Sequence, residues 1–406
     1  MASKITCLVT LHGMGFMQPP QAGADGVELV NSGYADPLHQ HFRQCLEEKL
    51  SDDPQRTRPK PGENGAIYVE SRWLDAQNRA SREEGLKRLG VWRNDRQHVD
   101  TPDAPLVAND EPVSHVALVY SKLEPMGPAI GATLITFGTG LASSSHYAGA
   151  SGLIHMALAE GLAMIGQHTT PGQKPTSSRP RINLWSRLVK RLGLHGQAAP
   201  AASPGLLSML RNFEDEVACY VCRNEDRERV RSFMYEALMR LAYREDVDNI
   251  VLNTHSNGTV IAFDVLRHLP EEATSKIKAF VTAGSPLRKY VDYFHWGNQI
   301  QTRFPVEPWY NFWDRHDPVA DPLAPPLSWR LGDQIVRSDE QLFSRIDLNS
   351  ETPCWIKVED REVDNSKNSS GGGLQVHNYW DNEVEFVKQL CNIVRAIANN
   401  QGAIAE

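Results

Sequence analysis

The sequence Asn249-Ile250-Val251-Leu252-Asn253-Thr254-His255-Ser256-Asn257-Gly258 decides the fold of this chain. Residues 249–253 are mostly apolar and partly β-branched, which is typical of a buried strand. From position 257 to about 269, apolar side chains recur at helical spacings, which predicts a helix. The stretch therefore predicts a β–α unit in which Ser256 occupies the turn.

The turn itself has the composition of a nucleophile elbow. A serine hydroxyl is a weak nucleophile, and a sharp strand-to-helix turn thrusts it toward a base. The usual pattern is G-x-S-x-G, but Thr254 replaces the first glycine here, which requires that the neighbouring strand leave room for its side chain. Gly258 lets the helix pass close to the strand, and the Asn257 N–H at the helix start points to where an oxyanion would form. The simpler alternative is a serine in an ordinary β–α turn.

Outside this unit, apolar strands alternate with helical patterns. Strands are expected at residues 5–11, 66–73, 115–120, 279–282 and 309–313, and helices at 36–50, 206–243 and 382–398. Because strands separated by helices favour a mostly parallel sheet, we predict the α/β class, with helices flanking a central sheet.

The middle of the chain has an unusual composition. Residues 125–159 contain no Asp, Glu, Lys or Arg. We interpret this segment as a buried helical hairpin, with a mobile lid or a lipid-contacting segment as alternatives. Residues 166–205 are rich in Gly, Pro and Ser, which predicts a flexible surface segment. Within them, residues 184–192 form a basic amphipathic stretch that either packs on its own domain or contacts an anionic membrane.

The charge and cysteine content argue against several classes of protein. Lys and Arg number 42 against 50 Asp and Glu, a net charge of -8, which argues against a nucleic-acid partner. Cys219 and Cys222 form a C-x-x-C without a second pair nearby, so no metal site is expected. The apolar run at residues 5–11 is too short for a signal-peptide core, and we expect a cytoplasmic protein.

A nucleophilic serine requires a base and an acid that orients it, and in an elbow-bearing sheet the acid precedes the base in the chain. For the acid we favour Asp317, because the Asp-Pro pair makes a rigid turn after the strand at 309–313. Asp314 is the alternative acid, and Asp321 is the third candidate.

The base is expected in a late loop before the last helix. His377 has that position, because three consecutive glycines precede it and the terminal helix follows. His316 is the competitor, but it lies in the acid loop itself.

A second donor for the oxyanion is expected from the loop after the first strand. His12-Gly13-Met14-Gly15 follows that strand, and its glycines free the backbone. We predict the Met14 N–H as the donor, with His12, Gly13 and Gly15 in support.

These motifs together resemble the α/β-hydrolase superfamily, especially its lipase- and esterase-like members. The resemblance covers residues 4–16 and 245–398, and it includes Gly284-Ser285-Pro286, Asp317-Pro318-Val319 and His377-Asn378-Tyr379-Trp380. It implies an α/β-hydrolase fold in one domain over residues 1–406, with a helical cap inserted at 74–205.

The resemblance also implies a reaction. Ser256, His377 and Asp317 would form a catalytic triad that cleaves a carboxylic ester through an acyl-enzyme, and no cofactor would be needed. The expected partner is a small-molecule or lipid ester, with peripheral membrane contact through 125–159 or 184–192. The alternatives are a thioesterase, amidase or acyltransferase with the same triad, and a non-catalytic scaffold that binds a lipid or a partner protein.

Overall fold

The computed structural model describes a set of segments separated by gaps. They are residues 5–13, 21–22, 29–31, 33–47, 66–71, 79–95, 97–101, 106, 113–120, 220, 224–288, 306–317, 319–323, 330–331, 334–335, 344–346, 353–355, 358–365 and 374–399. Their centre is a seven-stranded sheet in the order β15-β10-β9-β8-β1-β7-β4. Every neighbouring pair in it is parallel. The α/β class with a mostly parallel sheet is therefore confirmed.

The strands of this sheet come from both halves of the chain. They are β1 (Ile5–Leu11), β4 (Ile67–Glu70), β7 (Val113–Val119), β8 (Val247–His255), β9 (Ile277–Ala283), β10 (Trp309–Trp313) and β15 (Val358–Glu362). Four antiparallel pairs lie outside it: β2 (Gln21–Ala22) with β3 (Leu29–Asn31), β5 (Val91–Trp92) with β6 (Val99–Asp100), β11 (Arg330–Leu331) with β12 (Gln334–Ile335), and β13 (Ser344–Ile346) with β14 (Pro353–Trp355).

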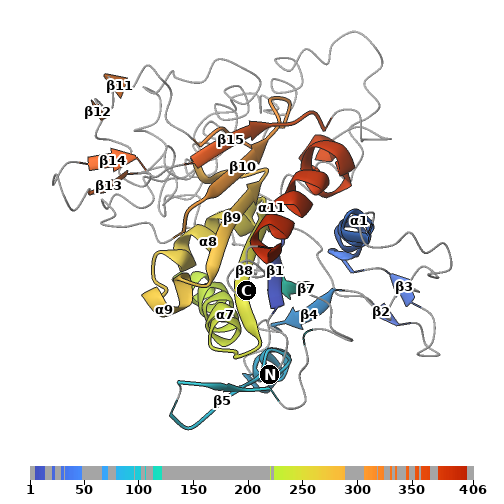
Figure 1. Cartoon of the computed structure of the whole chain (residues 1–406), viewed down its shortest axis with the longest axis vertical. Helices are drawn as coiled ribbons and strands as arrows, with labels where there is room; N and C mark the ends of the chain where they lie inside the picture. Colours follow the sequence, from blue (N-terminus) through green and yellow to red (C-terminus); the bar gives the residue numbers. More distant parts are fainter. Residues whose placement is uncertain are drawn as a thin grey trace, which may run out of the picture.

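Helices cover both faces of the sheet (Figure 1). On one face, α7 (Asn224–Ala242) contacts α2 (Arg79–Lys87), α8 (Asn257–Leu266) and α9 (Glu271–Thr274). On the other face, α1 (Asp36–Glu47) packs against α11 (Lys388–Asn399). The turns η4 (Leu374–His377), η5 (Tyr379–Asp381) and η6 (Glu383–Val387) lead into α11.

The alternation of side chains in β1 explains why this strand is mostly apolar, with Thr6 and Thr10 as its two polar residues. All of its residues are buried. Ile5, Cys7, Val9 and Leu11 pack in the core that contains α7 and α8, whereas Leu8 packs in the core that contains α1 and α11. Successive side chains of a strand point to opposite faces, so a strand covered on both faces is apolar at most positions and does not alternate between apolar and exposed polar residues.

The order of the strands makes the carboxyl ends of β1 and β8 a topological switch point. After β1 the chain moves to β4 and β7 on one side, and after β8 it moves to β9, β10 and β15 on the other. The helices that follow these two strands, α1 and α8, therefore lie on opposite faces of the sheet. In open α/β sheets, ligands bind outside the carboxyl ends of the strands at such a switch point.

The boundaries expected for the insertion, 74–205, require a correction. Residues 113–119 form β7, which lies between β1 and β4 inside the sheet and so cannot belong to a cap. The segments 125–159, 166–205 and 184–192 lie outside the described residues, and their predicted roles stay predictions.

Two helix boundaries also differ from those expected. The helix after Ser256 ends at Leu266, three residues before the expected position 269, and Pro270 disfavours the helical conformation at Leu269 itself. The terminal helix begins with a π turn, η6, before α11.

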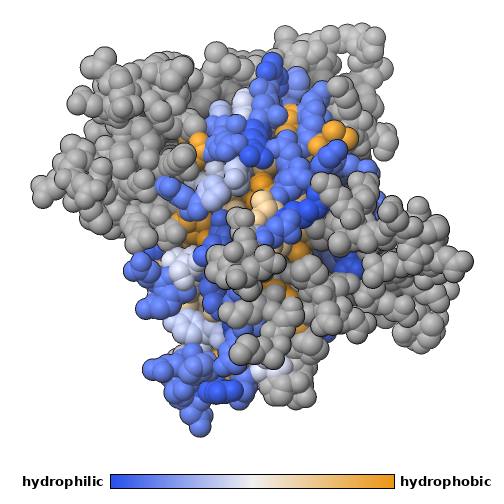
Figure 2. Space-filling model, in the orientation of Figure 1, coloured by the Kyte–Doolittle hydropathy of each residue, from blue (hydrophilic) through white to orange (hydrophobic). Residues whose placement is uncertain are grey.

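The described surface is mostly polar. Among the described residues, the exposed large apolar side chains are Val91 and Val384. Figure 2 shows hydrophilic residues over most of the described part of one face, with small apolar areas between them. Within the same residues, every helix is too short or too polar to cross a lipid bilayer.

Candidate active site

Ser256 sits in a strained turn between β8 and α8. Its φ is 54° and its ψ is -133°, and among the described residues it is the one non-glycine with positive φ. Such a conformation costs about 1–3 kcal/mol and persists only where the surroundings enforce it. Here the Ser256 N–H donates to the Ala283 carbonyl at 2.9 Å, and the Ser256 carbonyl accepts from the Thr259 N–H at 3.0 Å. The turn therefore has the strained geometry that the elbow motif predicts.

Two glycines allow the end of β1 to touch this turn. A Cβ atom on Gly13 would lie 2.2 Å from the Ser256 Cβ, and one on Gly258 would lie 2.3 Å from the His12 carbonyl oxygen. Neither distance is tolerable for a real Cβ atom, so both positions require glycine. The structure thus brings His12, Gly13 and Gly258 together with Ser256. Met14 and Gly15 lie outside the described residues.

Thr254 fits where the elbow motif usually has glycine. Its side chain is buried, and its hydroxyl donates to the Val281 carbonyl of β9 at 3.2 Å. The neighbouring strand therefore leaves room for the threonine and satisfies its polar atom, so the departure from the usual motif does not disturb the turn.

His377 and Asp317 form a buried pair. The distance from His377 Nδ1 to Asp317 Oδ2 is 2.7 Å. The Tyr379 hydroxyl donates to the same oxygen at 2.9 Å, and the Val319 N–H donates to Oδ1 at 2.9 Å. Burial alone would raise the pKa of the Asp317 carboxyl, but the charge and hydrogen bond of His377, helped by the two further donors, hold that pKa below its usual range. Asp317 is therefore ionised at neutral pH, and it keeps the imidazole proton on Nδ1.

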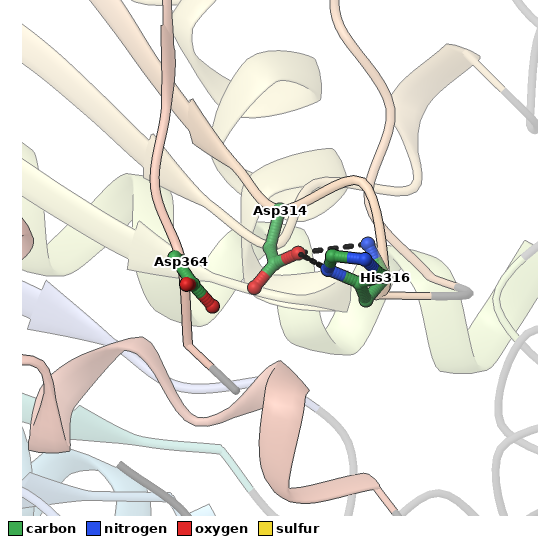
Figure 3. A group of neighbouring side chains, drawn as sticks. All are labelled: Asp314, His316 and Asp364. Carbon is green, nitrogen blue, oxygen red and sulfur yellow. Dashed lines mark hydrogen bonds and ion pairs between the residues drawn. The ribbon is translucent and has the colours of Figure 1, made fainter. Parts of the chain in front are cut away.

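Asp314, the alternative acid, faces away from this pair. Its Oδ1 accepts from the His316 N–H at 2.7 Å and lies 3.1 Å from the His316 Nδ1 (Figure 3). Its Oδ2 accepts from the Asn365 N–H at 2.6 Å. The competing base, His316, contacts Asp314 and is largely exposed. Of the two leading acids, the structure brings Asp317 to His377. Asp321, the third candidate, contributes its backbone N–H to the Ser285 carbonyl.

The alternative acid also belongs to a group that has metal-ligand chemistry. The ligand atoms of Asp314, His316 and Asp364 lie within 4.8 Å of one another, and the two carboxylates are neighbours in Figure 3. Carboxylate and imidazole donors suit several divalent cations. Both oxygens of Asp314, however, already accept backbone hydrogen bonds. The expectation that no metal is needed stays a prediction.

The hydroxyl of Ser256 and the imidazole of His377 are not hydrogen-bonded to each other. His377 Nε2 is buried and has no hydrogen-bond partner among the described residues. Since Nδ1 donates to Asp317, Nε2 is the nitrogen left to accept a proton. In enzymes without bound substrate, the hydrogen bond between a nucleophile and its base is often long, and it tightens only in the complex. One of the two contacts expected within the triad is thus present in the structure.

Two residues beside His377 were not expected to contact it. A Cβ on Gly284, whose φ is +63°, would lie 2.7 Å from the His377 Cε1. The Gly-Ser-Pro turn at 284–286 is the sequence signal for this close approach. His255 donates from Nε2 to the His377 carbonyl at 2.7 Å, and nothing in the sequence marks it except its place before Ser256.

His12 anchors the loop after β1. Its ring stacks on Tyr120 at 4.4 Å between centroids, and its Nδ1 donates to the Gly13 carbonyl, which also accepts from the Tyr120 hydroxyl at 2.9 Å. Burial lowers the pKa of His12 to about 4, so the imidazole is neutral at pH 7. These contacts hold Gly13 against the serine turn.

The chain was compared with family models, with curated proteins and with solved structures, and no match was found in any of the three. What can be inferred about its chemistry therefore rests on the sheet and on the geometry around Ser256.

Proposed function

We propose that this protein is a serine hydrolase with the α/β-hydrolase fold, and that it cleaves carboxylic esters with Ser256, His377 and Asp317. The observation that carries the proposal is the buried Asp317–His377 pair in a sheet whose switch point holds the strained Ser256 turn.

The placement of the three residues supports the hydrolase fold in particular. Ser256 follows β8, Asp317 follows β10, and His377 follows β15, so all three lie beyond the carboxyl ends of parallel strands. The chain order of nucleophile, acid and histidine is the order of the α/β-hydrolase triad. A serine in an ordinary β–α turn would not account for the positive φ or for the His–Asp pair.

In the proposed reaction, the Ser256 hydroxyl attacks the ester carbonyl carbon while its proton passes to His377 Nε2. Asp317 stabilises the imidazolium that forms. The tetrahedral intermediate collapses, the C–O bond to the alcohol breaks, and His377 returns the proton to the leaving oxygen. Water then attacks the acyl-enzyme, gives a proton to His377 and releases the carboxylic acid, after which Ser256 regains its proton.

The oxyanion of this intermediate requires two donors. Asn257 is the first residue of α8, so its N–H lies at the positive end of the helix dipole, where a negative charge is stabilised. We propose it as one donor and the Met14 N–H as the other. Loss of one such donor typically lowers kcat by about 10²–10³-fold.

The substrate is proposed from composition. The uncharged segment 125–159 favours an ester with an apolar acyl chain, and this segment or residues 184–192 would contact a membrane surface if the ester is a lipid.

Labelling with a fluorophosphonate tests the proposal, because this probe reacts with activated serines. Wild-type protein should label, Ser256→Ala should not, and Ser275→Ala, which removes an exposed serine at the end of α9, should label like the wild type. Para-nitrophenyl esters should be cleaved faster than matched thioesters and amides. A folded wild-type protein that never labels, or a Ser256→Ala variant that still does, would overturn the proposal.

A further inference from the structure

We propose that His255 is a positioning residue that ties the backbone of His377 to the strand bearing Ser256. The proposal rests on the proposed function, since it assigns a role within the same site. His255 is the last residue of β8 and is covalently joined to Ser256, so any bond from its side chain to His377 links the nucleophile directly to its base.

The contact is short and buried. The His255 Nε2 donates to the His377 carbonyl at 2.7 Å across 122 positions of sequence. The two rings lie 4.6 Å apart between centroids, and the Trp380 ring lies 5.3 Å from His255 on the same segment. All three side chains are buried. The imidazole of His255 therefore contacts the segment of His377 through both a hydrogen bond and tilted ring contacts.

The carbonyl that receives this bond needs a partner. His377 is the last residue of the turn η4, and the carbonyls at the end of a helical turn have no partner within it. A buried acceptor without a partner costs about 1–3 kcal/mol. The His255 side chain satisfies the His377 carbonyl, and the Asn365 side chain does the same for the neighbouring Val376 carbonyl at 2.7 Å.

The sequence before η4 is the reason why these hydrogen bonds matter for the position of His377. It contains three consecutive glycines at 371–373, the residue type that loses the most conformational freedom when it becomes ordered. Contacts made by the segment of His377 itself offset the cost of this loss of conformational freedom. Asp317 orients the ring of His377, and His255 fixes the backbone from which that ring projects.

His255 does not compete with His377 for the serine proton. Burial lowers the pKa of His255 to about 3, and the charge of His377 acts in the same direction. His255 is thus neutral at pH 7 and adds no positive charge beside the imidazolium that catalysis forms. Its bonded nitrogen, Nε2, carries the proton, which is the tautomer that a donor to a carbonyl requires.

A pair of substitutions separates the bond from the bulk of the side chain. In His255→Gln, the amide nitrogen lies about as far along the side chain as the imidazole Nε2 and still donates. In His255→Leu, the volume is partly kept but the donor is lost. His268→Leu is the matched control, because the His268 side chain also bonds a backbone carbonyl, that of Asp264 at 2.7 Å, but just beyond the carboxyl end of α8 and away from the site.

Steady-state ester hydrolysis gives the first readout. A misplacement of about 1 Å costs about 10²-fold in rate, so His255→Leu should lower kcat by about 10- to 100-fold with KM unchanged. His255→Gln should restore most of kcat, and His268→Leu should leave it unaltered. An equal kcat in His255→Leu and wild type would refute the positioning role of the His255 hydrogen bond. An equal loss of kcat in the Leu and Gln variants would refute it as well.

Amide hydrogen exchange of the peptide spanning residues 374–381 gives a readout that does not depend on activity. His255→Leu should exchange faster there than the wild type, and His255→Gln should match the wild type. If the wild type cleaves no ester but exchange changes as expected, the tie stands and only the proposed function fails. If esters are cleaved and exchange is the same in all variants, the tie fails and the proposed function stands.

Discussion

Replacing Asp317 with Asn should stop catalysis by changing the tautomer of His377. The carboxylate of Asp317 accepts the Val319 N–H at 2.9 Å on one oxygen, and on the other it accepts His377 Nδ1 at 2.7 Å and the Tyr379 hydroxyl at 2.9 Å. An amide has one oxygen and cannot serve both sides. If that oxygen keeps the Val319 bond, the NH₂ group faces His377, whose proton must then move to Nε2, where it blocks transfer from Ser256.

The size of the effect follows from these contacts. The opposite amide orientation would set the NH₂ group against the Val319 N–H and leave both of these donors unpaired, whereas the blocked tautomer leaves only the Tyr379 hydroxyl without its acceptor. Each unpaired buried donor costs about 1–3 kcal/mol. The blocked tautomer therefore prevails. In a serine protease, the same substitution at the triad acid lowers kcat by about 10⁴-fold, which corresponds to about 5.5 kcal/mol of activation free energy. We expect a loss of about 10³–10⁴-fold in kcat for Asp317→Asn.

Asp314→Asn is the matched control. Its two oxygens accept backbone N–H groups of His316 and Asn365, so the amide loses one bond and about 1–3 kcal/mol of stability, but it does not reach His377. Ester hydrolysis and urea unfolding of both variants should show a loss of kcat in Asp317→Asn and mainly a loss of stability in Asp314→Asn. The reverse pattern would refute the assignment of the acid.

Three further outcomes are expected. Gly284→Ala should lose most esterase activity, because its Cβ would lie 2.7 Å from the His377 Cε1; a fully active, equally stable variant would contradict this. Gly258→Ala should lower the free energy of unfolding in urea by about 1–3 kcal/mol, since its Cβ would lie 2.3 Å from the His12 carbonyl; an unchanged midpoint would speak against that contact. Burial lowers the pKa of His12 to about 4 and that of His255 to about 3, from 6.5. Below pH 6.5 the unfolded chain therefore binds more protons than the folded one, so the free energy of unfolding should fall on acidification, by up to about 1.4 kcal/mol per pH unit for each histidine. Urea titrations that give the same stability at pH 7 and at about pH 5 would contradict this expectation.

The sequence by itself determined the local elements of this protein. The apolar run at 249–253 and the periodic pattern after position 257 predicted β8 and α8, and the turn between them marked Ser256. Alternating strands and helices predicted the parallel sheet. These features depend on residues close together in the chain, whose spacing sets which faces are apolar and where the chain turns.

Only the tertiary structure decided which side chains meet. Asp314 and Asp317 follow the same strand and fit the same motif, but the bond to His377 crosses 60 positions, and no local spacing tells which carboxylate faces it. The space that the Thr254 side chain occupies depends on the neighbouring strand β9. The hydrogen bond from His255 to the His377 carbonyl joins residues 122 positions apart. Such contacts follow from how strands pair and how loops return to the sheet, which is a property of the whole packed chain and not of any segment within it.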